Sequence, residues 1–146
     1  MKVTSNVKKL SLVIGIGLLI GIFSYISEAK EKVDAQTMEA ESQLCLAKNI
    51  YFEARDQGLA SQMAVSLVVL NRVNDRRYPN TICDVIYQGP TYSWKPEFPV
   101  RNKCQFSWYC DGKSDKPKEK KAWDSALEIA SLILYSPKGL IDFTEG

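Results

Sequence analysis

The chain has 146 residues, of which 45% are hydrophobic and 25% charged, so it has room for one compact domain and a short additional segment. Its formal net charge of +2 is too small to indicate nucleic-acid binding, and we expect no nucleic-acid partner. The complete absence of histidine excludes a Ser/His/Asp or Cys/His catalytic site and a zinc site with imidazole ligands. General acid or base chemistry must therefore fall to carboxylates, lysine, tyrosine or cysteine.

The N-terminal segment differs from the rest of the chain. Three lysines among the first nine residues precede 17 uncharged, mainly apolar residues from Leu10 to Ile26. Such a run predicts a signal peptide or a signal-anchor helix over residues 1–29, with its basic end in the cytoplasm. Cleavage after Ala29, retention in the membrane, and a weakly held anchor that later leaves it, as in some phage lysis enzymes, all fit. The remainder is expected to be exported, to the periplasm or the extracytoplasmic face of the inner membrane.

The segment that follows leads into the first amphipathic helix. Residues 30–41 mix acidic and basic side chains, which is typical of a linker or a helical stalk, and the globular domain is expected over 42–146. Apolar residues then recur three and four positions apart, at Leu44, Ala47, Ile50, Tyr51 and Ala54. This spacing predicts a helix that ends before Gly58. Glu53 lies at the border of the apolar stripe and groups with Leu46 and Asn49.

Four cysteines follow the export segment: Cys45, Cys83, Cys104 and Cys110. An even number of cysteines in an oxidising compartment favours two disulfides, and three pairings stay open. The cysteines are separated by 38, 21 and 6 positions, which matches no common zinc pattern, so metal binding is the weaker alternative. We expect no metal and no cofactor.

The middle of the chain predicts two helices and a loop. Residues 61–73 are apolar almost all round between Met63 and Leu70, which predicts a buried central helix, with a strand as the alternative because of the valine content. Thr81 can cap a short helix that follows a turn. Residues 89–103 contain three prolines, a glycine and several aromatic residues, and we expect a long ordered loop there.

The last part predicts a strand and a helix. "CQFSWYC", residues 104–110, alternates like a strand, with Phe106 and Trp108 facing the core and Gln105, Ser107 and Tyr109 facing a cleft. Residues 113–121 hold five lysines and two acids, which indicates a solvated loop, with weak attraction to an anionic polymer as the alternative. Residues 123–134 return to helical spacing. The elements add up to an α+β domain that is mainly helical with a small β element.

Three ordered blocks carry a resemblance to a known family: "LAKNIYFEARDQGLASQMAVSLVVLNRV", "YPNTICDVIYQG" and "CQFSWYCDG". They resemble the catalytic domain of the SleB-type cell-wall hydrolases, the spore cortex-lytic enzymes and their relatives in Gram-negative bacteria and phages. The similarity runs from about Leu44 to Asp142. It implies a compact, lysozyme-like fold related to lytic transglycosylases, and peptidoglycan as the substrate, cut between N-acetylmuramic acid and N-acetylglucosamine. It also implies that Glu53 is the catalytic acid.

The chain departs from the family pattern at two places. Relatives usually continue Glu-Ala-Arg-Gly-Glu, whereas Asp56 and Gln57 follow Arg55 here. "LIDFTEG" stands where relatives continue into a Gly-Ala-Thr-x-Tyr-His-like segment that lines the cleft. The resemblance therefore leaves two interpretations, a fragment or a natural form that lacks one wall of the site.

The mechanism implied by the resemblance needs one carboxyl group. In a lytic transglycosylase the muramic acid 6-hydroxyl attacks within the same sugar and gives a 1,6-anhydro product. A muramidase would use a second carboxylate, for which the candidates are Asp56, Asp84 and Asp111. Some relatives carry an amidase label, but a chain without histidine does not fit the zinc amidase mechanism. The alternative from another class is a catalytically inactive, membrane-tethered domain that binds peptidoglycan.

Several residues near the predicted cleft are candidates for substrate binding: Asn49, Arg55, Asp56, Gln105, Ser107 and Tyr109. Asn49 lies one turn before Glu53, where it binds a sugar or has a structural role. Arg55 either touches substrate or pairs with an acid of the domain. Flat aromatic faces suited to stacking on sugar rings are supplied by Tyr87, Tyr92, Trp94, Trp108 and Tyr109. The protein is expected to act as a monomer.

Overall fold

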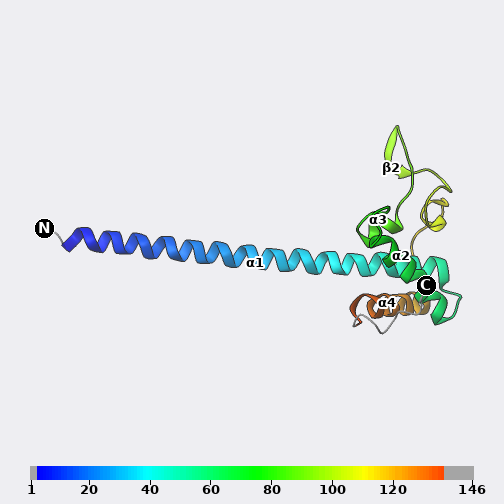
Figure 1. The fold of residues 1–146 in the computed structure, drawn as a ribbon, viewed down its shortest axis with the longest axis horizontal. Helices are drawn as coiled ribbons and strands as arrows, with labels where there is room; N and C mark the ends of the chain where they lie inside the picture. Colours follow the sequence, from blue (N-terminus) through cyan, green and yellow to red (C-terminus); the bar gives the residue numbers. More distant parts are fainter. Residues whose placement is uncertain (1–2, 137–146) are drawn as a thin grey trace. The chain divides into compact units, whose positions relative to one another are not determined.

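The computed structural model describes the backbone of residues 3–136 and the side chains of residues 25–136. The chain divides into two compact units, Met1–Glu39 and Ala40–Gly146. One helix, α1 (Val3–Ala54), belongs to both units (Figure 1). The side chains of the predicted apolar segment, Leu10–Ile26, lie almost entirely outside the described residues. Within the part that is described, no helix is both long enough and apolar enough to cross a membrane.

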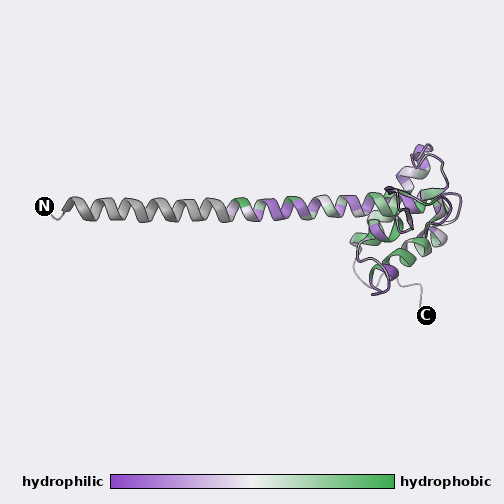
Figure 2. Ribbon diagram, turned by 90° about the horizontal axis from the view of Figure 1, so that it is seen from above, coloured by the Kyte–Doolittle hydropathy of each residue, from purple (hydrophilic) through white to green (hydrophobic). Residues whose placement is uncertain are grey.

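The described side chains of the first unit, residues 25–39, are all exposed. Most of them are hydrophilic, as the purple stretch of α1 in Figure 2 shows. The helix is continuous through residues 30–41, so this segment is helical and not extended.

The second unit is built on the last turns of α1. Three further helices follow: α2 (Leu59–Val73), α3 (Ile82–Ile86) and α4 (Lys120–Tyr135), and α2 packs against both α3 and α4. The predicted apolar spacing holds for most of α1, but Leu44 is 49% exposed whereas Leu46 and Asn49 are fully buried. The face of α1 that packs into the core is therefore wider than the predicted stripe of five residues. The largest fully buried side chains of the core are Leu46, Ile50, Ile86, Val69, Val85, Asn49 and Ser66.

Helix α2 was predicted to be buried all round, and this prediction is wrong. Only one face is buried, formed by Gln62, Met63, Ser66 and Val69, while Val68 is 44% exposed. The buried serine hydroxyl is satisfied locally, since Ser66 Oγ donates to the carbonyl oxygen of Gln62 at 3.0 Å. The apolar run on the outer face thus reflects composition and not burial, because single exposed aliphatic residues are common on protein surfaces.

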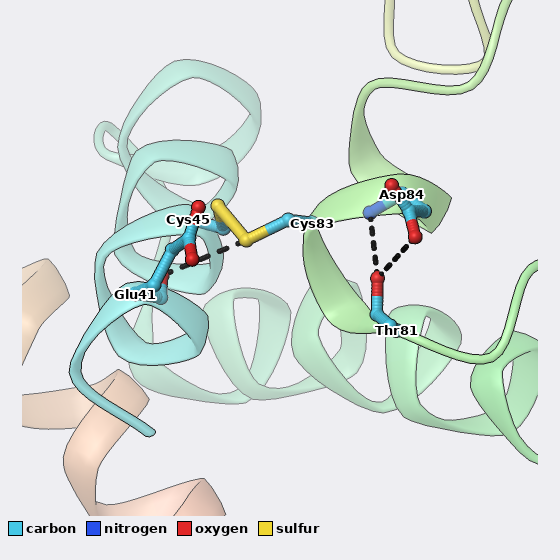
Figure 3. The surroundings of a disulfide bond; sticks show 5 residues. All are labelled: Glu41, Cys45, Thr81, Cys83 and Asp84. Carbon is cyan, nitrogen blue, oxygen red and sulfur yellow. Dashed lines mark hydrogen bonds between the residues drawn. A yellow bond between two sulfur atoms is a disulfide. The ribbon is translucent and has the colours of Figure 1, made fainter. Parts of the chain in front are cut away.

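Helix α3 has the predicted cap and is tied covalently to α1. Thr81 Oγ1 accepts a hydrogen bond from the backbone N–H of Asp84 at 3.1 Å, which satisfies a free donor at the helix start. Figure 3 shows the disulfide Cys45–Cys83, with a Cα–Cα distance of 5.4 Å, between α1 and α3. Two disulfides were predicted, and the second joins Cys104 to Cys110.

The β element lies elsewhere than predicted. Residues 89–103, expected to be loop, contain an antiparallel hairpin of β1 (Thr91–Tyr92) and β2 (Lys95–Pro99). Residues 104–110, expected to be a strand, form a bend and the 3₁₀ helix η1 (Ser107–Cys110).

The Cys104–Cys110 disulfide explains this difference. Its Cα atoms are 6.1 Å apart, whereas six steps of extended strand would separate them by about 20 Å. The period-two pattern still identified the core side chains, because Phe106 and Trp108 are 8% and 6% exposed. Gly89 allows the close approach of this loop, since a Cβ there would lie 3.1 Å from the Cα of Cys104.

Candidate active site

The last turn of α1 forms one wall of an open groove with a volume of about 610 Å³. The wall consists of Tyr51, Phe52, Glu53 and Arg55. Tyr51 is buried and Phe52 is half-buried, whereas the Glu53 side chain is exposed to the groove. Glu53 lies two residues after a core tyrosine and one before a buried alanine, so the backbone that carries its carboxyl group is fixed by packing.

The second wall is η1 with the residue that follows it, and it is attached to α1 from inside the core. Trp108 lines the groove together with Ser107 and Asp111. The indole Nε1–H of Trp108 donates to Asn49 Oδ1 at 3.0 Å. The Phe52 ring stacks on the same indole, with ring centroids 4.8 Å apart and an interplanar angle of 19°. These contacts hold η1 against the turn of α1 that carries Glu53.

The third wall is the lysine-rich segment, residues 113–119. Its side chains are largely exposed, as expected of a solvated loop, but Lys113, Lys116 and Lys118 also line the groove, which the sequence did not predict. The segment is anchored by Tyr51, whose hydroxyl oxygen accepts from the backbone N–H groups of Lys118 and Glu119, both at 3.1 Å. One tyrosine therefore joins the turn of α1 that carries Glu53 to the start of α4.

Three carboxyl groups of the groove differ in electrostatic environment. Partial burial removes water from the Glu53 carboxyl group and raises its pKa, although the residue as a whole is exposed. Burial also raises the pKa of Asp115, with the neighbouring charge of Asp111 acting in the same direction and that of Lys48 opposing it. The pKa of Asp111 is lowered, mainly because its carboxylate accepts from the backbone N–H of Lys113 at 2.7 Å. The groove thus contains two carboxyl groups whose pKa is raised and one whose pKa is lowered, a separation suited to dividing the acid role from that of a charged group.

Of the predicted substrate-binding residues, some line the groove and the others do not. Arg55 and Ser107 line the groove with Glu53. Arg55 also lies over the Tyr51 ring, 5.1 Å from its centroid, and 3.8 Å from the Asp56 carboxylate in an exposed pair that contributes little stability. Asn49 is buried, and its Nδ2 has no hydrogen-bond partner among the described residues.

The other candidates lie away from the groove lining. Within the described residues Asp56, Gln105 and Tyr109 are not part of its wall. The backbone N–H of Gln105 donates to the carbonyl oxygen of Gln88 at 2.9 Å, and Tyr109 packs on Tyr87 with ring centroids 4.6 Å apart. Asp84, one of the candidate second carboxylates, is at the start of α3 and accepts a hydrogen bond from Thr81. Asp111 is the candidate second carboxylate that shares the groove with Glu53.

Sequence reasoning missed Asp115, Glu119 and the three lysines of the groove. The charge run indicated exposure correctly, but no local signal indicated that the segment folds back over Tyr51, 67 residues earlier in the chain. Across the described side chains, no cluster of histidine, cysteine, aspartate or glutamate is arranged to hold a metal ion.

Comparison with protein-family models matches residues 56–139, more than half of the chain, to the family described as Cell Wall Hydrolase. The chain belongs to this family. The resemblance noted from the sequence is therefore confirmed, and the protein acts on peptidoglycan outside the cytoplasm. Two walls of the groove lie inside the matched range of this cell wall hydrolase, whereas Glu53 precedes its first residue by three positions. No curated protein and no solved structure matches the chain.

Proposed function

We propose that this cell wall hydrolase cleaves the glycan strand of peptidoglycan, with Glu53 as the general acid and then the general base. The observation that carries the proposal is the position of Glu53. It is a carboxyl group with a raised pKa, on a packed helix end, at the wall of a groove whose other walls carry polar and charged side chains. A raised pKa keeps the carboxyl group protonated to a higher pH, as an acid catalyst requires.

The reaction begins with proton transfer from Glu53 to the oxygen that leaves with N-acetylglucosamine, while positive charge develops on the muramic acid ring. The bond between C1 and that oxygen breaks. In a lytic transglycosylase the 6-hydroxyl of the same muramic acid then forms a bond to C1 and returns its proton to Glu53, which gives a 1,6-anhydro end. Asp111, with its lowered pKa, is suited to stabilising the positive ring because it stays ionised.

A muramidase is the second candidate, and it is favoured by the presence of Asp111 in the same groove. In this mechanism Asp111 would assist a water molecule or attack C1 directly, and the product would carry a reducing end. The two mechanisms share the role of Glu53 and differ in the chemical form of the new sugar terminus.

The test is mass spectrometry of the soluble products that the full chain releases from purified peptidoglycan. Anhydromuropeptides would support the transglycosylase, and reducing ends the muramidase. Glu53→Gln should lower turnover by roughly 10²- to 10⁴-fold, the usual contribution of a general acid. Glu119→Gln makes the same chemical change on another wall of the groove and serves as the matched control.

Full activity of Glu53→Gln would exclude Glu53 as the acid. A folded wild-type chain that binds peptidoglycan and releases no product would favour the binding-domain alternative. Release of free stem peptides with intact glycan would indicate an amidase instead.

We also propose that residues 1–29 direct export and hold the protein at the membrane. The apolar run and its basic flank support this proposal, and the two disulfides of the described domain fit an oxidising compartment. Cell fractionation tests it, since deletion of residues 1–29 should leave the protein in the cytoplasm. Separately, we propose that the protein is a monomer. Sedimentation equilibrium would test the oligomeric state.

A further inference from the structure

The hairpin of β1 and β2, residues 91–99, carries aromatic side chains that do not contribute to the core. Trp94 is 75% exposed and Phe98 is 48% exposed. By contrast Tyr87, Trp108 and Tyr109 pack on one another, with ring centroids 4.6 to 6.2 Å apart. The exposed tryptophan and phenylalanine lie on one short hairpin, and clustered exposed aromatic rings of this kind are candidates for contact with a partner.

The rings of the hairpin, the exposed Trp94 and Phe98 and the half-buried Tyr92, are held in place. Tyr92 and Trp94 contact each other with ring centroids 5.4 Å apart and an interplanar angle of 40°. On the returning strand the Lys95 ammonium lies 3.7 Å from the centre of the Phe98 ring, a cation–π contact. Two prolines in the hairpin, Pro96 and Pro99, restrict the backbone further. The pair of Tyr92 and Trp94 is therefore a preorganised aromatic surface.

The hairpin leads directly into a wall of the groove. Arg101 follows the end of β2 by two residues. Its guanidinium lies 3.4 Å from the position that a Cβ atom would take on Gly112, and Gly112 is the neighbour in sequence of the groove residue Asp111. The backbone N–H of Asn102 donates to the carbonyl oxygen of Cys110 at 2.9 Å, which fixes this junction to η1. From Trp94 to Arg101 the chain extends at most about 25 Å, so the aromatic surface lies within that order of distance from the junction beside the groove.

We propose that Tyr92 and Trp94 form a second contact site for the glycan strand of peptidoglycan, outside the groove where cleavage takes place. The inference rests on the proposed function, because it assumes that the polymer in the groove is a glycan. Sugar rings have an apolar face that stacks on an aromatic ring, and a polymeric substrate extends beyond the groove in both directions. The site would increase residence on the insoluble wall without taking part in bond cleavage.

The composition of the hairpin favours a sugar over a lipid surface. Residues 91–99, "TYSWKPEFP", include no leucine, isoleucine, valine or methionine, and they include the acidic Glu97. Segments that bind in the membrane interface combine aromatic residues with aliphatic ones on a basic background. The aromatic pair beside polar Ser93 is instead typical of a surface that stacks on rings and forms hydrogen bonds around them.

The experiment measures cosedimentation with purified insoluble peptidoglycan, using the full chain with Glu53→Gln so that the wall stays intact. Adding Trp94→Ala should weaken binding roughly 2- to 10-fold, from the usual contribution of one aromatic stacking contact. Trp94→Phe should retain most of the binding. Leu132→Ala removes another exposed apolar side chain, 47% exposed on α4, and should leave binding unchanged.

Cleavage assays separate this site from the groove. In an otherwise wild-type chain, Trp94→Ala should slow release from the insoluble wall and leave turnover of a short soluble glycan unchanged. Unchanged wall binding by Trp94→Ala, equal loss with Leu132→Ala, or a tryptophan effect seen only with phosphatidylglycerol vesicles would overturn the inference. If the wild-type chain cleaves nothing but Trp94 is needed for wall binding, the proposed function fails and the contact site stands.

Discussion

The buried hydrogen bond between Asn49 and Trp108 gives the sharpest test of how the groove is built. Trp108 Nε1 is 3.0 Å from Asn49 Oδ1, and the two residues are 0% and 6% exposed. Asn49→Leu keeps a similar volume but leaves the indole N–H without an acceptor, which costs about 1–3 kcal/mol. It also removes the unpartnered Nδ2 group, which offsets part of that cost, so we expect a net loss of about 1–2 kcal/mol.

A double-mutant cycle isolates the interaction. Trp108→Phe removes the donor, leaves Asn49 Oδ1 unsatisfied and opens space, so it should cost more than Asn49→Leu. The double variant has neither polar partner, and its cost should fall short of the sum of the single variants by about 1–2 kcal/mol. Urea unfolding of the four proteins measures this coupling, with m-values checked for constancy.

Additivity within about 0.5 kcal/mol would refute the reasoning, because it would mean that the two side chains do not share a hydrogen bond. Tyr109→Phe is the matched control, since it alters a half-buried aromatic residue of the same 3₁₀ helix by one hydroxyl group. The single variants should also lower glycan cleavage, because Trp108 lines the groove and Asn49 positions it. A variant that is destabilised but fully active would show that η1 does not shape the site.

Three further predictions concern the anchor, the acid and the covalent link between helices. Tyr51→Phe removes the acceptor of two backbone N–H groups and should speed amide hydrogen exchange at residues 118–119 while leaving the core protected; unchanged exchange would contradict the anchor. Glycan cleavage should decline as pH rises through the pKa of Glu53, because the protonated form is the acid, and burial places that decline above the range of an ordinary glutamate. A pH–rate profile without this alkaline limb would count against the assignment. Replacing both Cys45 and Cys83 by serine should lower the free energy of unfolding by about 4 kcal/mol, because the disulfide closes a loop of 38 residues in the unfolded chain. Urea unfolding measures the loss, and a value under about 1 kcal/mol would show that the disulfide does not stabilise the fold by restricting the unfolded chain.

Local patterns in the sequence determined the helices and the position of the acid. Spacing of three and four predicted the end of α1, and a single threonine predicted the start of α3, because both signals act within one or two helical turns. The helical wheel placed Glu53 at the edge of the buried stripe. The structure agrees, since its carboxyl group is exposed to a groove while burial raises its pKa.

Tertiary structure alone decided the cysteine pairing, the β hairpin and the third wall of the groove. Alternation in residues 104–110 identified the buried aromatic residues but not the backbone, because a disulfide across six positions is incompatible with an extended strand. The lysine-rich segment became part of the site through hydrogen bonds to Tyr51 from 67 and 68 residues away. Periodicity reports only neighbours along the chain, whereas these contacts depend on which distant surfaces can satisfy each other's polar groups when the core closes.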